Sequence, residues 1–237
     1  MTKREPMHVL IDSADINEIE SLYNDYPYNG VTTNPTILRA AGHDPIRQLQ
    51  EIRELLPPTS ELHAQLVSED TERMVEEAEF LISHIGEDLF IKVPVTQAGM
   101  RAIPKIVKRG IRVTATAVYT AMQAFMAAKA GASYTAPYVN RLDNLGADGV
   151  HVAKTIHDIF RIQGLETEVL AASFKNSQQI MELCAHGIGS ITAAPGVLRA
   201  LTYHDATFMA EEHFEDDFYQ LVNQVAGTHL HGSWLSR

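Results

Sequence analysis

A lysine lies in the middle of an apolar segment, LFIKVP, at residues 89–94. Lysine is rarely fully buried unless it is paired or has a chemical role. Burial disfavours the ammonium form and lowers its pKa, which gives a free amine near neutral pH. Such an amine is the nucleophile for Schiff-base chemistry on a ketone or an aldehyde. Lys92 is therefore a candidate catalytic residue, and the alternative is a lysine that reaches the rim or pairs with Asp12.

Polar side chains recur at the ends of the other strand-like segments. Their convergence on one mouth of a fold would form a small-molecule site. These residues are Asp12, Thr32, Thr33, Asn34, Gln65, Thr114, Thr116, Tyr138, Asn140, Arg141, Ser173, Lys175 and Thr192.

Tyr138 is a candidate for proton transfer, and Gln65 is a candidate for binding a water molecule. A phenol with a pKa near 10 transfers protons only through a water or in a favourable field, and the alternative for Tyr138 is aromatic packing. The Gln65 amide is neither an acid nor a base, so we expect it to hold a water together with Thr116, or else to be a buried amide bonded to its neighbours.

A phosphate clamp is one interpretation of Arg141, Ser173 and Lys175. The loops after the last strands of a barrel often bind phosphate, and arginine suits bidentate contacts. The alternative is a surface salt bridge between Arg141 and Asp143. Lys175 competes with Lys92 for the role of nucleophile, but it follows its strand and suits an anion contact better.

No metal site is expected. His151 and His157 lie six residues apart, which does not place two ligands on one helical face. His229 and His231 lie in a Gly-flanked tail.

Eight short apolar segments alternate with longer amphipathic ones along the chain. Alternation of this kind predicts parallel strands joined by crossover helices, and eight of them favour a closed (β/α)8 barrel. The alternative, an open doubly wound sheet, would have a Gly-rich turn after its first strand, and IDSADINE contains no glycine. The predicted strands are 8–12, 30–34, 61–67, 89–94, 112–118, 133–139, 167–173 and 189–195.

The helices of this α/β fold have recognisable ends. Asp15 is the expected N-cap of the first, with Glu18 completing a capping box. Cys184 lies in a helical pattern and is expected to be a small buried residue. We expect one barrel domain over residues 1–237, with 205–227 as an additional C-terminal helix that packs on a neighbouring subunit or over the barrel.

The overall charge narrows the class of partner. The 237 residues carry a formal net charge of -11, which disfavours nucleic-acid binding because phosphate attraction needs clustered Lys and Arg. No apolar run is long enough to span a bilayer, and the N-terminus is not a signal peptide. The single cysteine excludes an internal disulfide. We expect a cytoplasmic enzyme without membrane or nucleic-acid partners.

Five short sequences resemble the class I fructose-6-phosphate aldolase branch of the transaldolase family. They occur in the family's order and cover nearly the whole chain, beginning after DSADI near the N-terminus. They are GVTTNP (30–35), IKVP (91–94), TAVY (116–119), APYVNR (136–141) and AASFK (171–175).

The resemblance implies a role for each matched residue and no cofactor. Lys92 would form the Schiff base, and Asp12, Thr32 and Asn34 would contact the ketose or dihydroxyacetone unit. Tyr138 and a water held by Gln65 and Thr116 would transfer protons, and Arg141 and Ser173 would bind the substrate phosphate. The resemblance also implies rings of five subunits that stack as decamers, with the C-terminal helix reaching a neighbour.

Two positions favour the aldolase branch. Transaldolases carry Glu at the position of Gln65 and Phe at that of Tyr138. Thr114 differs from the Asn of transaldolases and from the aliphatic residue of the aldolase branch, and the AAP at 193–195 also departs from relatives.

The predicted activity is reversible cleavage of fructose 6-phosphate to dihydroxyacetone and glyceraldehyde 3-phosphate. The alternatives are a transaldolase that passes the dihydroxyacetone unit to another sugar phosphate, and a non-catalytic sugar-phosphate sensor. A sensor would not need Lys92, Tyr138 and Gln65 together.

Overall fold

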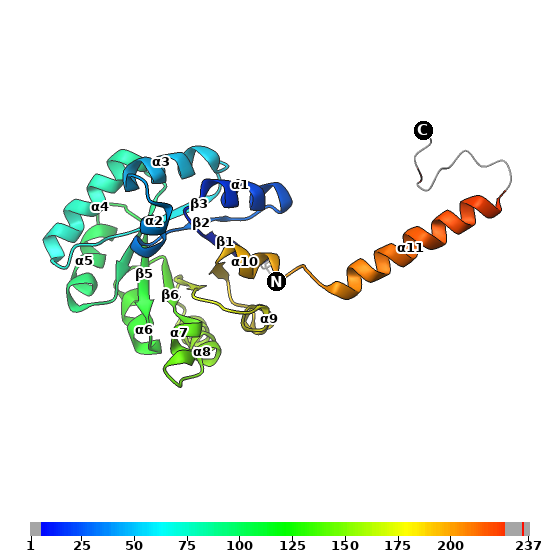
Figure 1. Ribbon diagram of the computed structural model, residues 1–237. Coiled ribbons are helices and arrows are strands. Elements are labelled where there is room, and N and C mark those ends of the chain that lie inside the picture. Colours follow the sequence, from blue (N-terminus) through cyan, green and yellow to red (C-terminus); the bar gives the residue numbers. More distant parts are fainter. Residues whose placement is uncertain (1–5, 226–233, 235–237) are drawn as a thin grey trace. The chain divides into compact units, whose positions relative to one another are not determined.

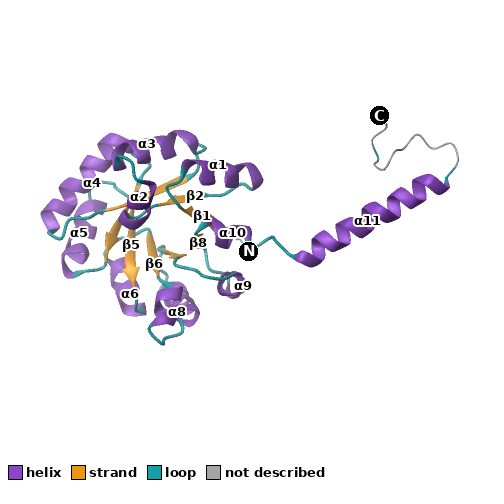
Figure 2. Ribbon diagram, viewed as in Figure 1, coloured by secondary structure: helices purple, strands orange, loops and turns teal. Residues whose placement is uncertain are grey.

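A closed barrel of eight parallel strands forms the body of the protein (Figures 1 and 2). The computed structural model describes residues 6–225 and 234. Each strand pairs with the next, and β8 pairs with β1 to close the ring. The strands are β1 (His8–Asp12), β2 (Gly30–Thr32), β3 (Glu61–Gln65), β4 (Phe90–Pro94), β5 (Val113–Val118), β6 (Tyr134–Pro137), β7 (Glu168–Ala171) and β8 (Ser190–Ala193). The predicted (β/α)8 barrel is confirmed.

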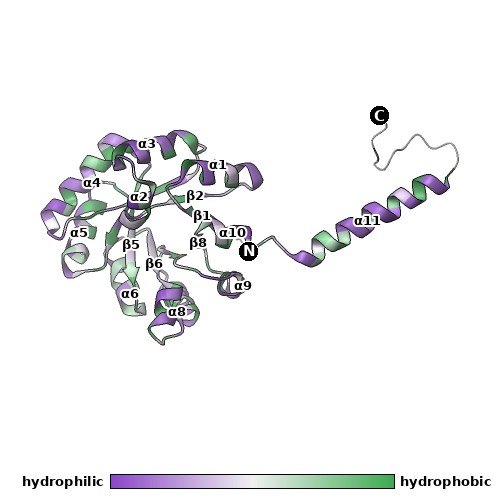
Figure 3. Ribbon diagram, viewed as in Figure 1, coloured by the Kyte–Doolittle hydropathy of each residue, from purple (hydrophilic) through white to green (hydrophobic). Residues whose placement is uncertain are grey.

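Helices surround the barrel and connect its strands. They carry both apolar and polar positions (Figure 3), and α8 shows the pattern, because its buried Val150, Ala153, Ile156 and Phe160 recur every three or four residues. The helices of the barrel are α1 (Ile16–Asp25), α2 (Pro35–Ala41), α3 (Pro45–Leu55), α4 (Thr71–Ile85), α5 (Gln97–Val107), α6 (Ala121–Lys129), α7 (Val139–Asn144), α8 (Gly149–Ile162), α9 (Ser177–His186) and α10 (Pro195–Arg199).

Inward side chains form layers of four, each contributed by alternate strands. The strand registers define three layers that matter for the site. The lysine layer contains Thr32, Lys92, Ala136 and Thr192. The floor layer, nearer the amino ends of the strands, contains Leu10, His63, Thr114 and Leu170. The upper layer, nearer the carboxyl ends, contains Asp12, Gln65, Thr116 and Ala172.

Two local expectations need correction. Asp15 caps α1 as predicted, but its backbone N–H donates to the Ser13 hydroxyl at 3.1 Å rather than to a capping-box glutamate. Among the described helices, the capping box lies at α6, between Thr120 and Gln123. Cys184 is exposed, whereas its neighbour Leu183 is buried.

The C-terminal part forms a second compact unit, Arg199–Arg237, apart from the unit Met1–Leu198. Within it, α11 (Asp205–Gln224) confirms the additional helix predicted there, and none of its residues is buried. Residues 226 and 227, at the end of the predicted helix, lie outside the described residues, as do His229 and His231.

Candidate active site

Lys92 lies inside the barrel on β4, with 5% of its surface exposed. Its Nζ donates to the backbone carbonyl of Thr33 at 2.7 Å. Burial lowers the pKa of Lys92, and the Asp12 carboxylate partly opposes that shift. The amine is therefore held closer to its neutral, nucleophilic form than a lysine in water.

A chain of hydroxyl groups connects Asp12 with the lysine layer. The Thr32 hydroxyl donates to the Asp12 carboxylate at 2.6 Å and lies 2.7 Å from the Thr192 hydroxyl. Thr32 and Thr192 are buried, so these hydrogen bonds fix their orientation. The arrangement keeps the Asp12 carboxylate in the upper layer and two oriented hydroxyls in the lysine layer itself.

Tyr138 follows β6 and turns back over the upper layer. Its hydroxyl lies 3.0 Å from the Thr116 hydroxyl. The Tyr119 ring meets the Tyr138 ring edge-on, and the Arg141 guanidinium lies 4.5 Å from its centre. Burial raises the pKa of Tyr138, whereas the Thr116 hydrogen bond and the Arg141 charge oppose the rise. The phenol is therefore protonated at neutral pH and oriented as a proton donor.

Gln65 is the register partner of Lys92 on the neighbouring strand β3. Because paired residues of parallel neighbours share a face, its side chain belongs to the same mouth. Gln65 is half-buried, and among the described residues its amide has no hydrogen-bond partner. Gln65 therefore lies at the site, and its amide is not used in a hydrogen bond to another described residue.

Asn34 has a structural role that the sequence analysis did not recognise. Its Oδ1 accepts a hydrogen bond from the backbone N–H of Ile37 at 3.1 Å and caps α2. The N-cap bond uses only the oxygen of the amide. The amide NH2 group remains as a donor at the carboxyl end of β2.

The three residues of the predicted phosphate clamp are only partly brought together. The backbone N–H of Asn140 donates to the Ser173 carbonyl at 2.8 Å, which joins the segment before Arg141 to the end of β7. Ser173 has a φ of 64°, a left-handed conformation that costs about 1–3 kcal/mol for a non-glycine residue. Lys175 is exposed, and its side chain makes no hydrogen bond or ion pair with Arg141.

The salt-bridge alternative for Arg141 is wrong. The carboxylate of Asp143 accepts hydrogen bonds from the Gly149 backbone at 2.8 Å and from the Gln179 amide at 2.6 Å. The Arg141 guanidinium lies over the Tyr138 ring instead. Arg141 is therefore held at the mouth by an aromatic contact, with its N–H groups available to an anion.

Sequence reasoning missed the bend in β5 that positions Thr116. Pairing with β6 shifts register between Ala115 and Val118, and Ala117 has a φ of 56°. A bulge re-aims the side chains beside it. Nothing in the identity of an alanine signals a left-handed backbone, so this feature needed the structure.

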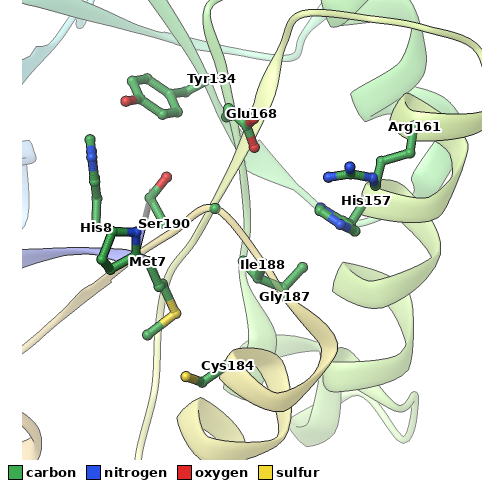
Figure 4. A pocket seen from close by; sticks show the side chains of 12 residues that line it. Met7, His8, Tyr134, His157, Arg161, Glu168, Cys184, Gly187, Ile188 and Ser190 are labelled. Atoms are coloured by element: carbon green, nitrogen blue, oxygen red, sulfur yellow. The ribbon is translucent and has the colours of Figure 1, made fainter. Parts of the chain in front are cut away.

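A cavity of about 280 Å³ lies at the opposite end of the barrel (Figure 4). Its walls include Tyr134, Glu168 and Ser190, which start their strands, together with His8. The amino-end face of such barrels serves stability rather than chemistry. We therefore place the candidate active site at the Lys92 end.

The described residues, 6–225 and 234, offer neither a cluster of metal ligands nor a membrane-spanning helix. No group of three or more His, Cys, Asp or Glu side chains is arranged to hold a metal ion there. No helix in that part of the chain is long and apolar enough to cross a membrane.

The fold and the site define a (β/α)8-barrel protein with a buried amine at the carboxyl ends of its strands. The chain belongs to the Transaldolase/Fructose-6-phosphate aldolase family, which matches residues 9–230. A probable fructose-6-phosphate aldolase from Streptococcus pneumoniae is 36% identical over 218 residues, covering 92% of this chain and 98% of that protein. A probable transaldolase from Brevibacillus brevis is 34% identical over 212 residues, covering 90% of this chain and 98% of the relative.

A solved structure described as native KDPGal shares the fold. Its TM-score is 0.55 at 14% sequence identity, and the match covers 82% of this chain and 84% of that one. The sequence relatives support an enzyme of the aldolase and transaldolase class, and the solved structure supports the barrel fold.

Proposed function

We propose that this protein is a class I aldolase that cleaves fructose 6-phosphate, or a closely related ketose, to dihydroxyacetone and an aldehyde. The observation that carries the proposal is Lys92: a buried amine of lowered pKa, hydrogen-bonded to a neutral carbonyl rather than neutralised by an ion pair. A lysine in this state attacks carbonyl carbon readily.

The proposed reaction begins when the Lys92 Nζ attacks the C2 ketone and its oxygen leaves as water. The resulting iminium withdraws electrons, so the C3–C4 bond breaks as the C4 hydroxyl loses its proton. The aldehyde departs, and an enamine of dihydroxyacetone remains on Lys92. Protonation of the enamine carbon and hydrolysis of the imine release dihydroxyacetone and regenerate the amine.

In this mechanism Tyr138 and a water carry the protons. The oriented Tyr138 hydroxyl supports the aldolase over the transaldolase alternative, because a proton donor beside the enamine quenches it before a second sugar arrives. Arg141, Ser173 and Lys175 are proposed to bind the substrate phosphate, and Asp12, Thr32 and Asn34 to bind the ketose hydroxyls.

The transaldolase alternative makes a distinct prediction about products. An aldolase releases free dihydroxyacetone from fructose 6-phosphate without any acceptor, whereas a transaldolase turns over only when an acceptor aldose phosphate is present. Product analysis with and without erythrose 4-phosphate separates the two.

Borohydride trapping with dihydroxyacetone tests the role of Lys92 directly. We expect the native chain to gain one reduced adduct at Lys92, and Lys92→Met to gain none. Lys175→Met is the matched control and should still be trapped. An adduct that persists in Lys92→Met and disappears in Lys175→Met would assign the Schiff base to Lys175 and contradict the proposal.

We further propose that the protein acts in the cytoplasm as a homo-oligomer, a pentamer or a decamer. Exposed apolar side chains along α11 support the oligomer, because large exposed apolar surfaces mark association sites.

A further inference from the structure

A partly buried chain of polar side chains lies beneath Lys92 and is not part of the mechanism above. The Tyr134 hydroxyl donates to Glu61 at 3.0 Å, and the second oxygen of Glu61 lies 3.2 Å from His63 Nε2. His63 Nδ1 lies 2.9 Å from the Thr114 hydroxyl. The chain thus runs from Tyr134, which lines the cavity in Figure 4, to the floor layer directly under the lysine layer.

Packing and a hydrogen bond at each nitrogen hold the ring of His63 in place. The ring is fully buried and stacks on Phe90, with centres 4.5 Å apart and planes within 8° of parallel. The Arg112 guanidinium in turn lies over the Phe90 ring, 4.0 Å from its centre. The titratable and charged groups around His63 are therefore Glu61, Tyr134, Lys92 and Arg112.

These contacts determine which nitrogen of His63 carries its proton. Burial alone would raise the pKa of Glu61, but the hydrogen bonds from His63 and Tyr134 hold it below its usual range, so Glu61 is an acceptor. Burial lowers the pKa of His63 despite Glu61, so the ring is neutral. A neutral ring that donates from Nε2 to Glu61 must accept at Nδ1, and the Thr114 hydroxyl is then the donor.

The direction of the Thr114 hydroxyl matters because Thr114 is the register partner of Lys92 on β5. With its proton committed to His63, the Thr114 oxygen offers only lone pairs to the rest of its surroundings. Fixed dipoles whose negative ends face a developing cation stabilise it without reorganisation. Here the cation would be the ammonium or iminium of Lys92, whose pKa the Asp12 carboxylate also raises.

We infer that His63 is a positioning residue: it orients the Thr114 hydroxyl, and the oriented hydroxyl stabilises the cationic forms of Lys92. The inference rests on the proposed reactivity of Lys92, and it adds a residue of the floor layer to those that set the pKa of Lys92. It also accounts for a polar residue at position 114, because His63 supplies the buried hydroxyl with a partner.

The reactivity of Lys92 towards 2,4-pentanedione tests the inference without needing the natural substrate. The Lys92 nitrogen attacks one carbonyl, that oxygen leaves as water, and the imine tautomerises to a conjugated enaminone that absorbs ultraviolet light. The rate rises with pH as the amine loses its proton, and its midpoint reports the pKa of Lys92. Lys92→Met supplies the baseline, and intact-mass analysis confirms a single adduct.

We expect His63→Phe, which retains the aromatic stack, to lower this midpoint by about half a pH unit, because the Thr114 hydroxyl is then free to turn its proton towards the amine. Thr114→Val should lower the midpoint equally, and the double variant should add no further shift, since both changes remove one interaction. His63→Asn, whose Oδ1 can accept from Thr114, should keep the native midpoint.

Several outcomes would overturn the inference. The first is an unchanged midpoint in His63→Phe. The second is that His63→Phe lowers the midpoint as much in the Thr114→Val variant as it does in the native chain. The third is that His63→Asn lowers the midpoint as much as His63→Phe does. If His63→Phe does not fold, Thr114→Val decides, and a native midpoint there is contrary to the inference. Absence of any Lys92 adduct in the native chain would instead refute the proposed function, and the inference with it.

Discussion

The pKa of Lys92 is set by two opposing influences of known origin. Burial removes the water that would solvate an ammonium group, and Asp12 returns part of that stabilisation. Neither an exposed lysine nor one in a tight ion pair would be a good nucleophile at neutral pH. Lys92 lies between these extremes because its direct partner is a carbonyl oxygen.

Asp12→Asn should therefore move the reactivity of Lys92 to lower pH. Asp12 raises the pKa of Lys92, so its removal lowers that pKa further, and the free amine appears at lower pH. The amide oxygen can still accept from Thr32, which preserves the hydroxyl chain. The pH dependence of borohydride trapping with dihydroxyacetone measures the shift. Asp25→Asn, an exposed carboxylate at the end of α1, is the control, and an upward shift in Asp12→Asn would refute the argument.

Tyr138→Phe should separate carbon–carbon cleavage from quenching of the enamine. The variant retains the ring between Tyr119 and Arg141 but loses the hydroxyl that contacts Thr116. We expect release of free dihydroxyacetone to fall about 10²-fold or more, the usual contribution of a positioned proton donor. Transfer to erythrose 4-phosphate should decrease much less. Tyr119→Phe is the matched control, and an equal loss of both reactions in Tyr138→Phe would count against this role.

The sequence predicted which residues lie at the strand ends of the site, but it did not predict how their side chains are oriented. Lys92, Asp12, Thr32, Gln65, Thr116 and Tyr138 were predicted because the carboxyl ends of barrel strands converge. The double role of Asn34 and the floor contact between His63 and Thr114 depend on register and on side-chain direction. A pattern of residue types along one strand does not contain that information.

The elements of the barrel were predicted well at their starts and less well at their ends. The predicted strand 30–34 ends at Thr32 because Asn34 turns to cap α2 and Pro35 opens that helix. The predicted strand 133–139 ends at Pro137 because Tyr138 is the residue that precedes α7. Both errors arise where a residue at a strand end also begins a helix, and both lie at the site.

Gly99 of α5 permits the close approach of that helix to the end of β4. A Cβ atom at this position would lie 1.9 Å from the carbonyl oxygen of Pro94, two residues beyond Lys92. Gly99→Ala should therefore separate α5 from β4 and cost about 1–3 kcal/mol of unfolding free energy. Because the shift falls beside Lys92, trapping should slow as well.

Chemical denaturation and trapping rates together measure this effect. Gly196→Ala is the matched control, since a Cβ atom there meets nothing within 4 Å. Unchanged stability in Gly99→Ala would show that the helix end can relax without moving β4.

At the scale of the whole molecule, α11 carries apolar side chains that the described residues leave exposed. Phe214 is 72% exposed and Leu221 53% exposed, and their spacing of seven places them on one helical face. We expect Phe214→Asp combined with Leu221→Asp to reduce the subunit number, because two charges on the contact face oppose association.

Light scattering coupled to size exclusion measures the mass of each species. Gln220→Asp combined with Asn223→Asp adds the same charge to α11 at polar positions and should leave the assembly unchanged. A native chain that is monomeric, or an unchanged mass in the Phe214 and Leu221 variant, would contradict the proposed oligomer.

The layered interior has a consequence for the order of events in folding. Thr192 on β8 and Thr32 on β2 meet only because β8 pairs with β1. The paired residues of β1 and β8 are about 180 residues apart in the chain. The surroundings of Lys92 therefore draw on the first and last strands together, so no nascent or truncated half-barrel can assemble them. A reactive amine at position 92 should appear in the final step of folding, when the ring closes, and its reactivity would time that closure.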